Sequence, residues 1–141
     1  MKKNSCIALM LLLVSAMVLM TPIFATETRA SDQISLYTMG VYNGDGTLDI
    51  DFYIAGKGIM DKVGCESIYL YKKVNGNWQF VTHLFEDYTG MSDTDSAAHG
   101  NTIYIGCNDG VEYKVVVTLF AENSAGRDSR TDVFFVTGQS N

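Results

Sequence analysis

The sequence predicts an all-β fold, a seven-stranded antiparallel sandwich of two sheets, and three observations lead to this prediction. Apolar and polar residues alternate with a period of two over 48–54 and again over 113–121, which is the pattern of a half-buried strand. Short turn sequences rich in Asn, Asp and Gly separate such stretches. After the N-terminal apolar segment, no pattern at helical spacing continues for more than a turn or two.

Seven segments rich in β-branched and aromatic residues are the predicted strands. They are 34–39, 48–54, 67–73, 78–85, 102–106, 113–121 and 132–137. Asn75-Gly76 joins the third strand to the fourth and predicts a type I′ hairpin, because this turn needs positive φ at both central residues. The strands form one domain at 34–137, between a short linker at 26–33 and a tail at 138–141.

The first 25 residues have the features of a signal peptide that enters the export machinery as a helix. Two lysines precede an uncharged apolar run at 6–20, and a Thr-Pro pair then interrupts the helix. Small residues allow cleavage after Ala25, which we favour, or after Ala30. An uncleaved membrane anchor is the alternative, because the apolar stretch approaches the roughly 20 residues that span a bilayer. We expect a protein that is secreted or held at the cell envelope, with no membrane insertion after cleavage.

The mature chain is acidic. Removal of 25 of the 141 residues leaves 116, with 8 of the 10 basic residues and all 16 acidic ones, so the net charge is −8. This charge opposes binding to nucleic acid and to anionic membranes, and it helps an exported protein to stay soluble. We therefore expect no nucleic-acid partner, while the sequence leaves the oligomeric state open.

Enzymatic activity is not expected. The sequence contains no G-x-S-x-G, H-E-x-x-H or C-x-x-C motif, and the two histidines, His83 and His99, lie on a predicted strand and in a polar loop. Asp49 and Asp51 share one strand face about 7 Å apart. They point from a sheet surface rather than into a cleft, which is typical of a solvated face. The sequence predicts neither a catalytic site nor a cofactor.

The segment from Gly110 to Gly126 carries a resemblance. A glycine turn precedes Tyr113, alternating valines follow, and the segment ends in Ala121-x-Asn123-x-x-Gly126. It resembles the sixth strand of a fibronectin type III domain, an immunoglobulin-like sandwich, although it is two residues longer than that family's spacing. The proline-rich ends of the family are missing. The likeness covers about 34–137, and the whole chain also resembles small exported bacterial proteins of unknown function that carry such a domain.

The resemblance implies roles for two aromatic residues and a place for two cysteines. Tyr113 becomes the tyrosine-corner residue, with its ring in the core and its hydroxyl bonded to the backbone, and Trp78 is similar to the tryptophan of the family's short C′ strand. Export favours a disulfide between Cys65 and Cys107. The expected topology, however, places these cysteines at opposite ends of the sandwich, about 20 Å apart. A disulfide needs Cα atoms within about 7 Å, so we predict two unpaired thiols.

Three aromatic residues are the candidate binding residues. Tyr69 and Tyr71 alternate with Ile68 and Leu70, so the tyrosines face outward near Trp78 if the aliphatic row is buried. The period alone leaves open which row is buried. Outward rings can stack on a carbohydrate or anchor a protein partner.

The sequence predicts a secreted, non-enzymatic module for extracellular recognition or structure, and a calcium-binding or calcium-stabilised module is the alternative. Calcium binds six to eight oxygen ligands. An acidic loop is expected at 86–101, where Asp93 and Asp95 are the candidate ligands. Clustered aspartates and serines are also typical of an ordinary solvated loop, which we favour.

Overall fold

The computed structural model describes residues 32–140, and all regular structure among them is β-strand. The strands are β1 (Ile34–Asn43), β2 (Thr47–Val74), β3 (Asn77–Phe85), β4 (Ser92–Gly106), β5 (Glu112–Asn123) and β6 (Gly126–Thr137). Within residues 32–140, no helix has the length and apolar character needed to span a membrane. The predicted signal peptide, both cleavage sites and most of the predicted linker lie outside the described residues. The all-β prediction is confirmed.

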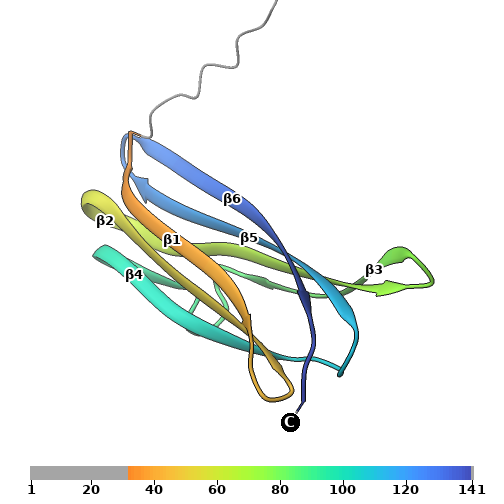
Figure 1. Ribbon diagram of the computed structural model, residues 1–141. Coiled ribbons are helices and arrows are strands. Elements are labelled where there is room, and N and C mark those ends of the chain that lie inside the picture. The colour runs from red at the N-terminus through yellow and green to blue at the C-terminus, as the bar shows by residue number, and fades with distance from the viewer. Residues whose placement is uncertain (1–31, 141) are drawn as a thin grey trace, which may run out of the picture.

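The other strands are arranged around β2, which pairs with four of them (Figure 1). One edge of β2 pairs with β1 up to Gly56 and with β5 from Lys62 onward. The opposite edge pairs with β4 up to Gly64 and with β3 from Ser67 onward. β6 pairs with the far side of β5. All pairings are antiparallel, and the six strands form one sheet that curls into a half-barrel.

A bend allows β2 to continue over 28 residues. The register with β4 shifts between Ala55 and Met60, so that 56–59 lie opposite a single residue of β4. Within this bulge Gly58 has a φ of 113°, which L side chains rarely adopt. The buried Met60 folds back onto Gly56, where a Cβ would lie 2.4 Å from its Cγ. The second and third predicted strands are therefore one continuous strand, and residues 32–140 contain six strands rather than seven.

The core lies on the inner face of the curled sheet. The alternating patterns of β2 and β5 place their apolar rows there, as predicted. The most completely buried of these residues include Leu48, Ile50, Ile54, Ile68, Leu70, Val115, Val117 and Leu119. Burial of Ile68 and Leu70 also settles which row of this part of β2 faces inward, because Tyr69 and Tyr71 must then project from the outer face. The predicted Asn75-Gly76 hairpin is confirmed, with φ of 50° and 79° at its two residues.

Three strands extend at least four residues beyond their predicted bounds, and β4 differs most. It begins at Ser92 rather than at residue 102, so the predicted acidic loop at 86–101 is wrong beyond residue 91. Residues 92–96 of β4 pair with 60–64 of β2. Their strand conformation is held by backbone hydrogen bonds, and their side chains are mostly exposed, so the sequence lacks the apolar alternation that would reveal it. β1 likewise extends to Asn43, and β6 begins at Gly126.

We expect Ile50→Ala to lower the free energy of unfolding by about 2–4 kcal/mol, because it removes a fully buried side chain and leaves a cavity between β1 and β4. Urea denaturation followed by circular dichroism measures the change. Tyr104→Ala on the outer face of β4 is the control, since Tyr104 is 66% exposed, and it should change stability by no more than about 0.5 kcal/mol. Equal losses in the two variants would contradict this assignment of the core.

Candidate binding surface on the outer face of the sheet

The outer face of β3, β5, β6 and the second half of β2 carries a cluster of aromatic and valine side chains. Tyr69 and Tyr71 project from this face, and the cross-strand register places residues of the other three strands beside them. We call this surface the ring face. Its members are Tyr69, Tyr71, Trp78, Phe80, His83, Phe85, Val116, Val133 and Phe135. The three predicted binding residues thus share one face with six residues that were not predicted to belong to a binding surface.

The rings of this face contact one another at an angle. The ring centroids of His83 and Phe85 are 4.5 Å apart, and those of Trp78 and Phe135 are 5.6 Å apart. The planes of the contacting rings are inclined by 32° to 82°, so the rings support one another without forming a flat platform. Phe80 and Phe135 nevertheless remain 54% and 67% exposed. A large apolar surface is therefore open to solvent.

Lysine side chains border one end of the ring face. The ammonium of Lys114 lies 4.4 Å from the ring centroid of Tyr71 and 5.5 Å from that of Trp78, within the range of cation–π attraction. The ammonium of Lys73 lies 5.7 Å from the ring centroid of Trp78 and forms an ion pair of 2.6 Å with Glu112. Trp78 and Phe135 also line an open hollow of about 430 Å³ at this end.

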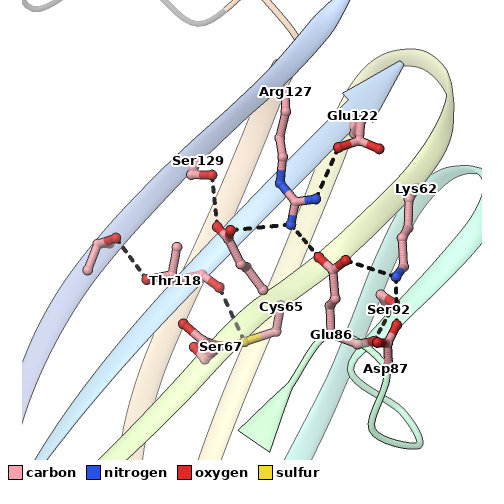
Figure 2. Close-up of polar contacts among 12 residues, drawn as sticks. Lys62, Cys65, Ser67, Glu86, Asp87, Ser92, Thr118, Glu122, Arg127 and Ser129 are labelled. Atoms are coloured by element: carbon pink, nitrogen blue, oxygen red, sulfur yellow. Dashed lines mark hydrogen bonds and ion pairs between the residues drawn. The ribbon is translucent and has the colours of Figure 1, made fainter. Parts of the chain in front are cut away.

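An arginine network borders the opposite end (Figure 2). Arg127, at the start of β6, contacts carboxylates from three other parts of the chain: Glu86, Glu122 at 3.0 Å and Glu66 at 3.4 Å. Its guanidinium carbon lies 3.8 Å from the ring centroid of Phe120, which it covers. Glu86 also accepts a hydrogen bond of 3.1 Å from Lys62. An open hollow of about 640 Å³ lies between this network and the ring face.

The network shifts the pKa of its members. Partial burial alone would raise the pKa of Glu86, but the hydrogen bonds from Arg127 and Lys62 outweigh burial and hold that pKa below its ordinary value of 4.5. Burial alone would lower the pKa of Arg127, but its interactions with the carboxylate partners outweigh burial and raise that pKa above its ordinary value. Since Arg127 and Glu86 are 41 residues apart, no local spacing in the sequence could reveal their contact.

Tyr113 and the two cysteines lie away from the exposed rings. Tyr113 is buried, and its hydroxyl accepts a hydrogen bond of 2.9 Å from the backbone N–H of Asn108. Cys65 and Cys107 are both free thiols, the first buried and the second half-buried. Burial raises the pKa of the Cys65 thiol to about 12.

The acidic residues considered in the sequence analysis do not gather into a metal centre. Asp93 and Asp95 are exposed on β4, and residues 32–140 contain no group of three or more His, Cys, Asp or Glu side chains placed to hold a metal ion. Asp49 and Asp51 lie on the outer face of β2 and accept hydrogen bonds from Thr47 and Thr102. These two hydroxyl-to-carboxylate hydrogen bonds belong to a hydrated sheet surface.

Comparison with known proteins assigns no family. No protein family and no curated protein matches the chain. Among solved structures it is similar to the crystal structure of Spo0M, a sporulation control protein from Bacillus subtilis, with 9% identity and a TM-score of 0.43. The match covers 74% of this chain and 49% of that chain, so the chain spans about half the length of that protein. A likeness at this TM-score carries no functional conclusion.

Arg127→Met should lower the free energy of unfolding by about 1–2 kcal/mol at pH 7, because it removes the charged donor from three carboxylates and keeps an apolar side chain over Phe120. Arg130→Met is the matched control, since Arg130 donates to the carbonyl of its neighbour Ser129. The control should stay within about 0.5 kcal/mol of the wild type in chemical denaturation.

Arg127→Met and the wild type should also differ in how much stability they lose in acid. The folded-state pKa of Glu86 is lowered, so this group contributes stability above pH 4.5 that is lost as the pH falls through its folded pKa. Without Arg127 that pKa rises toward its unfolded value. Arg127→Met should therefore lose less stability than the wild type between pH 6 and acid conditions, as measured by melting temperature. A parallel loss in both proteins would show that Arg127 does not hold Glu86 ionised.

Thiol labelling of the native protein should leave Cys65 unmodified at pH 8, because the thiol is buried and its raised pKa leaves almost no thiolate. Peptide mapping after iodoacetamide treatment locates the label. Cys65 should react fully once the protein is unfolded in guanidinium chloride. Rapid labelling of Cys65 in the native state would mean that this part of β2 opens readily.

Proposed function

We propose that the chain is a non-enzymatic recognition domain that binds a protein partner through the ring face. One observation carries this proposal: large apolar side chains are exposed together on one sheet face, with Phe80 and Phe135 more than half exposed. Soluble domains rarely leave such a patch uncovered unless another molecule binds there. Aromatic residues are also the side chains that most often carry the binding energy of protein interfaces.

The geometry of the rings favours a protein over a carbohydrate. A sugar stacks on the flat face of a ring, whereas the rings here are tilted against one another and present edges as well as faces. Tyr69, Val116 and Val133 form an uncharged row across the middle of the surface, and the ion pairs lie at its two ends. An apolar centre with a polar rim is the usual anatomy of a protein interface.

We also propose that the fold is a sandwich of the fibronectin type III kind. Two groups of neighbouring strands support this: β1, the first half of β2 and β4, and then β3, the second half of β2, β5 and β6. Counting the halves of β2 separately gives seven strands. The hydrogen bond from the Asn108 backbone to the hydroxyl of Tyr113 is the contact expected of a tyrosine corner.

The proposed location is outside the cytoplasm, either free or at the cell envelope. The basic start, the apolar run at 6–20 and the cleavage options after Ala25 or Ala30 support it. The net charge of −8 on the mature chain suits an exported protein that must stay soluble.

Photo-crosslinking on the producing cells tests the proposed surface. Benzoylphenylalanine in place of Phe135 should form light-dependent adducts with a polypeptide, because position 135 lies in the ring face. The matched control carries the same group in place of Tyr104, which is 66% exposed compared with 67% for Phe135 but lies on β4. Adducts from both positions alike, adducts with polysaccharide only, or none from either position would contradict the proposal.

A further inference from the structure

The two ends of the ring face carry opposite net charge. At the end bordered by Arg127, four carboxylates and two cations give a net charge of −2. These residues are Glu66, Glu86, Asp87, Glu122, Lys62 and Arg127. At the other end two positive side chains, Lys73 and Lys114, accompany one carboxylate, Glu112, so the net charge is +1. The charge therefore changes sign along the direction of the strands.

The middle of the surface is free of charge up to its edge. β3, which forms that edge, contains nine residues and no Lys, Arg, Asp, Glu or Pro, and within residues 32–140 it pairs only with β2. Natural edge strands usually carry charges or proline that prevent association with other chains. The comparable edge of β4 is partly covered, because His99 and Asn101 both hydrogen-bond to the carbonyl of Gly90. In a mature chain cleaved after Ala25, whose net charge would be −8, the ring face is thus a place where two copies can meet without strong repulsion.

We infer that the partner of the ring face is a second copy of this chain, in a symmetric dimer with the two ring faces packed together. The inference rests on the proposed function and names its partner. A two-fold axis that lies in the interface and crosses the strands brings the lysine end of each copy opposite the Arg127 end of the other, so unlike net charges face each other twice. An axis along the strands would place like ends together. The charge pattern therefore selects the first arrangement.

The packing expected in this dimer follows from the ring geometry. Tilted rings such as Phe80 and Phe135 present edges as well as faces, and aromatic pairs prefer edge-to-face or offset contact, so rings of the two copies can pack against one another. The apolar centre of each copy is then desolvated by the other, and the charged ends remain at the rim, where salt screens them.

Sedimentation equilibrium of the purified exported protein tests the inference. We expect a mass of two chains at high concentration, with dissociation on dilution. Phe135→Asp should raise the dissociation constant by roughly a hundredfold or more, because it removes a large exposed ring and buries a charge in the interface of both copies. Tyr104→Asp, a substitution of equal exposure on β4, should leave the dimer unchanged. A mass of one chain at every concentration, or a dimer that Phe135→Asp leaves intact, overturns the inference.

A charge exchange tests the relative direction of the two copies. Lys114→Glu should weaken the dimer by about tenfold, because it removes the positive end, and Glu66→Lys in the same chain should restore part of the loss. No recovery in the double variant overturns the crossed arrangement. If the protein sediments as a monomer while position 135 crosslinks to a different polypeptide, the second-copy inference fails and the proposed recognition function stands. If position 135 forms no polypeptide adduct, both fail.

Discussion

The structure depends on the occupation of both edges of β2 along nearly its whole length. β1 and β5 share one edge and β4 and β3 the other, so β2 supplies backbone partners to every strand except β6. A strand that is hydrogen-bonded along both edges has its backbone groups occupied, so only the side chains on its two faces can make other contacts. The bulge at 56–59 curls that strand, and its inner face then becomes the core. The outer face is left available for other uses.

The ring face follows from this arrangement. The inward row of β2 contains Ile68 and Leu70, so Tyr69 and Tyr71 are fixed on the outside by the backbone rather than by any contact of their own. β3 and β6 then add rings from opposite sides, and Trp78 reaches Phe135 across two intervening strands. The Arg127 network ties β2, β5, β6 and the segment after β3 together at one end of this surface. The proposed binding surface and the Arg127 network therefore lie on the same part of the sheet.

Local alternation predicted what depends on local sequence. It identified the buried rows of β2 and β5, the hairpin at Asn75-Gly76 and, conditionally, the outward direction of Tyr69 and Tyr71. It did not predict that β4 begins at Ser92, since that segment becomes a strand by pairing with distant residues of β2. The place of Phe135 beside Trp78 and the partners of Arg127 depend on strand order, which no spacing in the sequence encodes. The candidate surface was thus only partly accessible before the fold was known.

The described chain enters and leaves the sheet at opposite ends (Figure 1). At one end the backbone N–H of Gln33 bonds to Asp128 at the start of β6, and at the other the carbonyl of Gln139 accepts a hydrogen bond from Gly46. A tensile force between these two points would run along the strands and load the hydrogen bonds of each ladder in shear, many at once. Because these hydrogen bonds would have to break together, the geometry favours a high resistance to stretching along the strands.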